Sequence, residues 1–93
     1  MLVGTLSVQV YIPGATSLKD KRRVVKSMIA KVQNRFNVSI AELHSEDLWQ
    51  RATIGVACIG DSREHIERQL QYLLNFLDAE PNWEVIQVDI ELN

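Results

Sequence analysis

The hydrophobic period of this chain switches between two and 3.6 residues, and the order of the switches constrains the fold more than any other feature. Apolar residues recur at every second position in residues 2–12, 38–43, 49–59 and 83–92, as they do in half-buried strands. After the first and the third of these segments the period becomes helical, with one apolar stripe along each helix. The sequence therefore predicts the order β-α-β-β-α-β.

Two right-handed crossovers in this order give the ferredoxin-like arrangement, an α+β fold. It has a four-stranded antiparallel sheet with both helices on one face. A chain of 93 residues has room for one two-layer core and no second one. We therefore expect a single ferredoxin-like domain over residues 1–93.

Local signals predict where the helices begin and end and which way the last strand faces. Ser17 is the expected N-cap of the first helix and Asn37 its left-handed terminator, and Asp61 is the expected N-cap of the second helix. Val85 is expected to face away from the helices. The last strand is predicted to turn four aliphatic residues toward them: Ile86, Val88, Ile90 and Leu92.

Positive charge is concentrated on the first helix. Residues 17–35 hold seven of the ten basic residues and a single acid, Asp20, for a net charge of +6, while the rest of the chain carries −8. Such a cluster is typical of a surface that contacts phosphates, although a solvated helix face is the alternative. The predicted nucleic-acid contacts are Lys19, Lys21, Arg22, Arg23 and Lys26.

The sheet face away from the helices is the second candidate surface. Its predicted centre has small and polar residues without the stacked aromatics of RNA-recognition modules. Small residues allow close approach of another sheet, so we expect a homodimer interface, with a simply solvated face as the alternative. The predicted interface residues are Tyr11, Trp49, Arg51 and Thr53.

Catalytic and metal-binding patterns are weak. His44, His65 and the single cysteine, Cys58, have no metal-ligand spacing, and the acidic turn at residues 44–47 is predicted to be solvated. A phosphate enzyme that uses the helix start at Ser17 as an anion site is a third hypothesis, but no general base lies nearby in the sequence. We predict no catalytic residue, metal, cofactor or small-molecule substrate.

The location of the protein is predicted from three features. The N-terminus lacks the basic region of a signal peptide, and no apolar run approaches the roughly 20 residues that span a bilayer. Cys58 alone cannot form an internal disulfide, and its apolar neighbours predict a buried thiol. A soluble, cytoplasmic protein without membrane contact is expected.

Two short strings point to a known family. SLKDKRR at residues 17–23 and DLWQRA at residues 47–52 precede a last strand through Val88 and Ile90. Together they resemble the YlxP-like family of short bacterial proteins, over essentially the whole chain. The resemblance implies a ferredoxin-like fold and no established enzymatic activity. Since such proteins are commonly encoded among transcription and translation factors, it also implies an RNA- or ribosome-linked role.

These observations give two main hypotheses. The first is a non-enzymatic accessory protein that contacts RNA or a ribosomal particle through the basic start of the first helix. The second is a homodimeric interaction module that uses the open face of the sheet.

Overall fold

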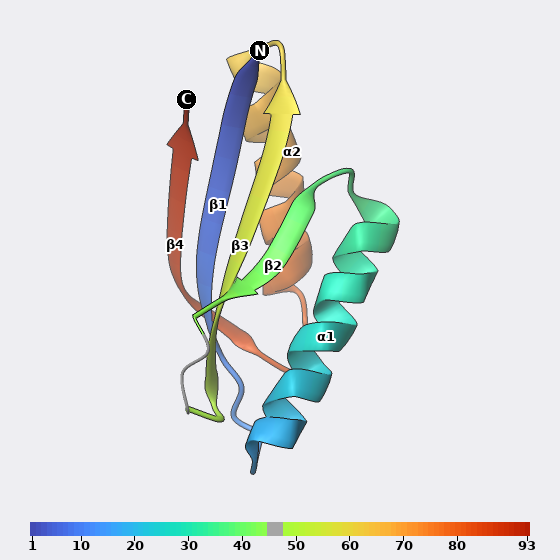
Figure 1. Cartoon of the computed structure of the whole chain (residues 1–93), viewed down its shortest axis with the longest axis vertical. Helices are drawn as coiled ribbons and strands as arrows, with labels where there is room; N and C mark the ends of the chain where they lie inside the picture. Colours follow the sequence, from blue (N-terminus) through green and yellow to red (C-terminus); the bar gives the residue numbers. More distant parts are fainter. Residues whose placement is uncertain (45–47) are drawn as a thin grey trace.

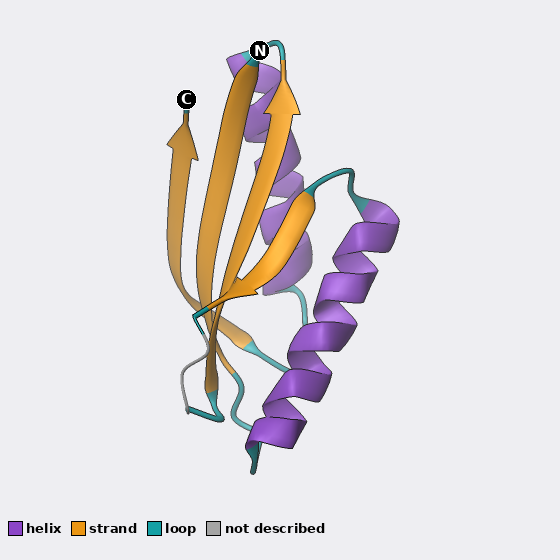
Figure 2. Cartoon of the chain, in the orientation of Figure 1, coloured by secondary structure: helices purple, strands orange, loops and turns teal. Residues whose placement is uncertain are grey.

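The computed structural model describes residues 1–44 and 48–93. Its elements follow the predicted order: β1 Leu2–Tyr11, α1 Leu18–Arg35, β2 Ser39–Leu43, β3 Arg51–Gly60, α2 Arg63–Asp78 and β4 Glu84–Leu92. The sheet has the strand order β2-β3-β1-β4 with antiparallel pairs throughout. Both helices cover one face of it (Figures 1 and 2). The predicted ferredoxin-like α+β fold is confirmed.

The core lies between the sheet and the two helices. Even-numbered residues of β1 and β3 face the helices, and odd-numbered ones form the opposite surface, which we call the open sheet face. Gly4 occupies a helix-facing position where a Cβ would overlap Ile66 Cγ2, so its missing side chain lets α2 approach β1 closely. The largest fully buried side chains are Leu6, Ile12, Ile54, Ile66, Leu70, Leu73, Leu77, Val8, Val10 and Val32.

The ends of α1 agree with the prediction at the start and differ at the finish. Ser17 is the N-cap, and its side chain accepts a hydrogen bond from the Asp20 N–H. The helix ends at Arg35, and its C-cap, Phe36, has an extended backbone. The prediction that Asn37 adopts the left-handed conformation is wrong, because His44 alone among the described non-glycine residues has a positive φ, of 61°.

α2 starts one residue later than predicted and ends beneath a tryptophan. Its N-cap is Ser62, which accepts from the His65 N–H, so the prediction of Asp61 is wrong. At the other end the buried Trp83 donates its indole N–H to the Leu77 carbonyl at 2.8 Å. That bond satisfies one of the carbonyls that a helix leaves free at its C-terminus.

β4 contains a bulge that changes which of its residues face the helices. Gln87 pairs with Gln9 and Val85 with Val10, so Ile86 is an extra residue between them. Val85 therefore points to the helix side, where it packs against the core. The prediction that Val85 faces away from the helices is therefore wrong. The prediction that Ile86 faces the helices in regular alternation with Val88 and Ile90 is wrong as well.

Two further findings bear on the predicted location. Within the described residues, none of the helices has the length and apolar character needed to cross a membrane. Cys58 is buried in β3, as predicted. Burial raises the pKa of its thiol, which keeps the group protonated and unreactive at neutral pH.

Candidate nucleic-acid interface

The start of α1 is held by reciprocal hydrogen bonds. Ser17 Oγ accepts from the Asp20 N–H at 3.1 Å, while the Asp20 carboxylate accepts from the Thr16 hydroxyl at 2.6 Å and the Thr16 N–H at 3.0 Å. These bonds, together with the nearby charge of Arg23, lower the pKa of Asp20. The junction therefore fixes the direction of the first helical turns.

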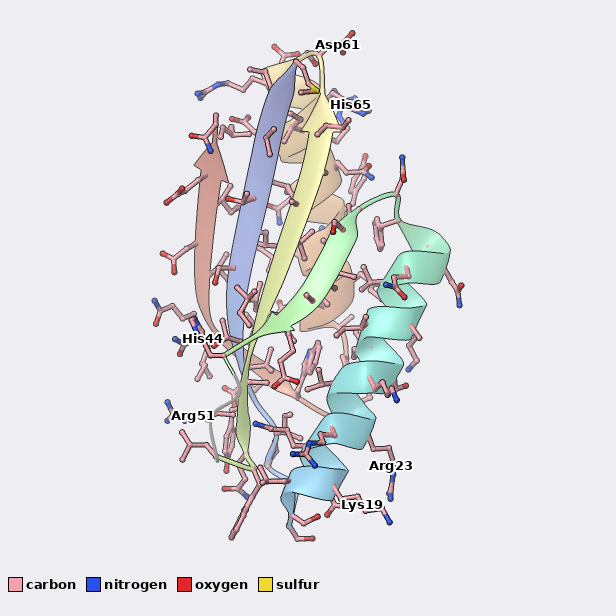
Figure 3. All side chains as sticks on the ribbon, viewed as in Figure 1. Lys19, Arg23, His44, Arg51, Asp61 and His65 are labelled. Carbon is pink, nitrogen blue, oxygen red and sulfur yellow. The ribbon has the colours of Figure 1, made fainter. Side chains whose placement is uncertain are left out.

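Four cations project from these turns into solvent. At 100° per residue they lie within an arc of roughly 100°, and they extend over about 10 Å of the axis at 1.5 Å per residue. Figure 3 shows two of them, Lys19 and Arg23, pointing away from the sheet. No ion pair joins any of the four to a carboxylate in the described part of the chain. We call this group the basic strip: Lys19, Arg22, Arg23 and Lys26.

Lys21, the fifth predicted contact, lies in the interior. It is 3% exposed, and its Nζ is 3.8 Å from Glu42 Oε2. Glu42 is directly opposite the buried Ile54 in the sheet, so its side chain is on the helix side of β2. Lys21 therefore belongs to the packing between α1 and β2, and we leave it out of the basic strip.

The two remaining cations of α1 are engaged within the protein. Lys31 Nζ lies 3.6 Å from Glu80 Oε2, a carboxylate that is almost buried. The guanidinium of Arg35 lies over the Phe76 ring, 5.0 Å from its centroid, in cation–π geometry. Lys31 and Arg35 are exposed too, but each interacts with a residue outside α1, unlike the cations of the basic strip among the described residues.

A shallow groove runs along one side of the basic strip, between α1 and β2. It has a volume of about 320 Å³, and its lining includes Arg22 and Lys26 with Ile29 and Glu42. The two cations stand on the helix side of the groove, and the carboxylate that holds Lys21 stands on the other.

Three of the four predicted interface residues lie at one end of the open sheet face: Tyr11, Arg51 and Thr53. Tyr11 pairs directly with Arg51, and Thr53 pairs with Gln9 on the same face. Trp49 lies in the turn before β3 and is 49% exposed. Figure 3 shows Arg51 near the end of the sheet that also holds the start of α1.

The centre of the open sheet face is hollowed. A depression of about 430 Å³ lies over small residues of β1, β2 and β3, with Asp89 and Glu91 of β4 at its rim. A Cβ at Gly55 would come within 2.6 Å of Leu43 Cδ1. Gly55 therefore lets the Leu43 side chain lie against the sheet at the side of this hollow.

A residue of the second family string, Gln50, holds the loop that precedes the first string. Gln50 donates from Nε2 to the backbone carbonyls of Pro13 and Ala15, each at 3.3 Å. The backbone carbonyl of Gln50 accepts from the Ile12 N–H at 2.8 Å. The second string thus holds the loop that leads to Ser17 and the first string. Asp47, at the start of the second string, lies outside the described residues.

Comparison with known proteins identifies the family. Residues 3–90 match the profile of a family described as "Protein of unknown function (DUF503)". The chain belongs to the DUF503 family. It is also 42% identical, over 83 residues, to "Uncharacterized protein YlxP" of Bacillus subtilis (strain 168), an alignment that covers 89% of this chain and 90% of that protein. The predicted YlxP-like membership is confirmed.

The DUF503 match over residues 3–90 includes the basic strip and most of the open sheet face. Among residues 1–44 and 48–93, there is no cluster of three or more histidine, cysteine or acidic side chains suited to a metal ion. His44 and His65 lie at opposite ends of the sheet (Figure 3). Part of the predicted turn cluster, Glu46 and Asp47, falls outside the described residues.

In this DUF503 chain a carboxylate, that of Asp20, lies at the helix end where the anion site at Ser17 was considered. The Asp20 carboxylate already accepts from the backbone N–H and the hydroxyl of Thr16. Its lowered pKa keeps it negative at neutral pH, where it opposes a second anion at the same helix end.

Sequence reasoning missed two residues that position the site, Glu42 and Gln50. A signal for Glu42 existed: it is a charged residue at a helix-facing position of its strand, and Lys21 is a charged residue within the apolar arc of its helix. Two such residues in one two-layer core require each other. Gln50 gave no signal beyond its place in the family string.

Proposed function

We propose that this DUF503 protein is a non-enzymatic accessory protein that binds RNA, either free or in a ribosomal particle, through phosphate contacts of the basic strip. One observation carries the proposal. Four exposed cations share one face of α1 without a carboxylate partner among the described residues, whereas Lys21 and Lys31 of the same helix pair with Glu42 and Glu80. Cations left unpaired beside paired ones are free to neutralise an external polyanion.

The size of the basic strip indicates how such binding would behave. Four cations over about 10 Å of helix can neutralise at most about four phosphates. For a single strand, the slope of log K against log salt would then be no steeper than about −3. The strip supplies charge without aromatic side chains, so we expect binding with little sequence preference.

The rest of the molecule would orient the protein on the polyanion. Outside residues 17–35 the chain carries a net charge of −8. The acids of α2 and β4 would be repelled by phosphates while α1 is attracted. An orientation with the outer face of α1 toward the RNA follows from this separation of charge.

A titration with matched variants tests the proposal. Fluorescence anisotropy of a labelled RNA hairpin would be measured over a salt series for the wild type, for Arg22→Glu with Arg23→Glu, and for Arg63→Glu with Arg68→Glu on α2. Both double variants replace two exposed arginines and change the net charge equally. We expect the α1 pair to weaken binding at least about tenfold and the α2 pair to weaken it much less.

Two results would overturn the proposal. One is an affinity that does not depend on salt, and the other is an equal loss for the two double variants. If neither result is found, co-sedimentation with ribosomal particles over the same salt series would distinguish free RNA from a particle as the target.

A second candidate function is a homodimeric interaction module, which a different observation favours. The hollow of the open sheet face has the exposed Leu43 in its lining, and the exposed Leu48 lies at one end of the same face beside Gln9 and Thr53. Trp49, the next residue along the chain, is also exposed. β1 and β3 have ten residues each, β4 nine and β2 five, so at about 4.8 Å between strands and about 3.3 Å per residue the sheet face covers roughly 540 Å². This flat area approaches the about 800 Å² of accessible surface that each partner buries in a stable complex.

Light scattering at micromolar concentration tests the dimer. Trp49→Ala is expected to shift the equilibrium toward monomer. Tyr72→Ala, which removes another exposed aromatic residue from α2, is expected to leave it unchanged. A wild-type protein that stays monomeric throughout the concentration series would end this candidate.

A further inference from the structure

β4 presents a long unpaired edge. It is an outer strand of nine residues, whereas β2, the other edge, has five. Asn93 and Val3 exchange both backbone hydrogen bonds at 2.9 Å. Because such pairs alternate along an antiparallel ladder, the backbone groups of Asp89 and Glu91 point to β1. Those of Val88, Ile90 and Leu92 point outward, and we call residues 87–92 the β4 edge.

Two of the three residues with outward backbone groups, Val88 and Ile90, also carry exposed aliphatic side chains. Val88 and Ile90 pair with Val8 and Leu6, which are buried beneath α2. Yet Val88 is 37% exposed and Ile90 is 45% exposed, because α2 does not extend over them. The helix side of the β4 edge therefore offers apolar surface next to free hydrogen-bonding groups.

The opposite side of the β4 edge is acidic. Asp89 and Glu91 alternate with the aliphatic residues and stand on the open sheet face, opposite Ser7 and Thr5. No ion pair joins either carboxylate to a cation in the part of the chain that the structure describes. The edge thus has one apolar side and one negatively charged side.

This pattern discriminates against pairing with a second copy. In the two-fold register centred on Ile90, Asp89 of each copy would lie directly opposite Glu91 of the other. Like charges placed directly opposite each other destabilise a strand pair, and acids on an edge are a known protection against self-association. A strand with basic residues at those positions would meet the two carboxylates favourably.

We propose that the β4 edge binds an extended segment of a partner protein, in which basic and aliphatic residues alternate, as an added fifth strand. Main-chain hydrogen bonds to Val88, Ile90 and Leu92 would align the segment, as in other cases of strand addition. Its aliphatic residues would cover Val88 and Ile90, and its basic residues would face Asp89 and Glu91. The proposal does not depend on RNA binding by the basic strip.

A blocked hexapeptide of alternating lysine and valine is the probe. Two peptides serve as controls: one has the same residues with all lysines placed first, and the other has glutamate in place of lysine. Amide chemical shifts and hydrogen exchange of the protein would be followed by NMR during each titration. We expect the alternating peptide to shift and protect the outward amides of Val88, Ile90 and Leu92, and to bind at least about tenfold more tightly than either control.

Two protein variants separate backbone pairing from charge attraction. Val88→Pro removes one outward N–H, a change that an edge strand tolerates, and it is expected to abolish amide protection. Asp89→Lys with Glu91→Lys is expected to reverse the preference from the lysine to the glutamate peptide. Glu64→Lys with Asp78→Lys, which makes the same charge change on α2, is expected to preserve it.

The proposal is overturned by any of three results. These are equal binding of the alternating and the reordered peptide, a preference that the Asp89 and Glu91 reversal does not alter, and no shift of the outward amides at millimolar peptide. The charge-reversal pair decides the outcome if Val88→Pro does not fold.

Discussion

The ammonium of Lys21 and the carboxylate of Glu42 face each other at 3.8 Å in the layer between α1 and β2. Lys21 is almost fully buried, while the Glu42 side chain is 28% exposed. The pair joins the basic helix to an edge strand, and Glu42 lines the same groove as Arg22 and Lys26.

Loss of the negative charge of this pair should destabilise the protein. Removing the Glu42 charge takes away part of what compensates the buried ammonium of Lys21. Because Glu42 is partly solvated, we expect Glu42→Gln to lower the free energy of unfolding by about 1–2 kcal/mol, less than for a fully buried pair. Urea denaturation would measure the change. Glu64→Gln, on the exposed surface of α2, is the control, and an equal effect of both would contradict the prediction.

Lys26 and Lys21 should differ in their effect on RNA binding. Lys26 belongs to the exposed basic strip, so Lys26→Met should make the salt slope shallower by about 1. Lys21→Met should leave the slope unchanged, because its ammonium lies beside Glu42 in the interior. The slopes would be compared at a temperature at which both variants are folded. A change in slope for Lys21→Met as large as for Lys26→Met would restore Lys21 to the contact surface.

The close approach of α2 to β1 at Gly4 should make that position intolerant of a side chain. A Cβ there would overlap Ile66 Cγ2 and lie 3.1 Å from Leu70 Cδ1. We expect Gly4→Ala to destabilise the protein by about 1–3 kcal/mol through overpacking. Gly14 has no atom within 4 Å of such a Cβ, so Gly14→Ala should be neutral or slightly stabilising. Thermal unfolding of the two variants would rank them, and the opposite order would refute the argument.

The helix junction should make a pH-dependent contribution to stability. Hydrogen bonds from the Thr16 hydroxyl and N–H lower the pKa of Asp20 below its ordinary value of 3.8. The stabilisation is therefore complete above pH 3.8 and is lost as the pH falls through the folded-state pKa. The stability difference between the wild type and Asp20→Asn should stay constant near neutral pH and shrink in acid.

Denaturant unfolding over a pH series checks that sign. Thr16→Val removes the hydroxyl donor, so it should reduce the acid dependence that Asp20 confers. A difference between the wild type and Asp20→Asn that grows on acidification would show that the carboxylate is not stabilised in the folded state.

The regular parts of the fold could be predicted from local sequence, because they depend on periodicity. The alternation in β1 and β3 correctly indicated the buried faces, and Ser17 was recognised as an N-cap because a hydroxyl preceded a helical period. At α2 two good capping residues are adjacent, and spacing alone favoured Asp61 over Ser62. Asn37 failed because the chain leaves α1 in an extended conformation directly into β2.

The candidate site could be predicted only in part. Charge density along α1 is a local property, and four of its five predicted contacts lie on the exposed surface. The burial of Lys21 depends on Glu42, which is 21 residues away in the sequence and is brought near by the sheet. The alternation in β4 also does not show that α2 leaves Val88 and Ile90 uncovered, because the area of sheet that a helix covers depends on how the two pack together.

The bulge at Ile86 has a consequence for any strand that joins the sheet. Before it, odd-numbered positions face the helices, at Trp83 and Val85, and after it even-numbered positions do, at Val88 and Ile90. A regular partner strand keeps one phase throughout, so it can match β4 only beyond the bulge. That leaves residues 87–92, about 20 Å at 3.3 Å per residue. The extra residue thus sets an upper limit on the length of partner that this edge can accept.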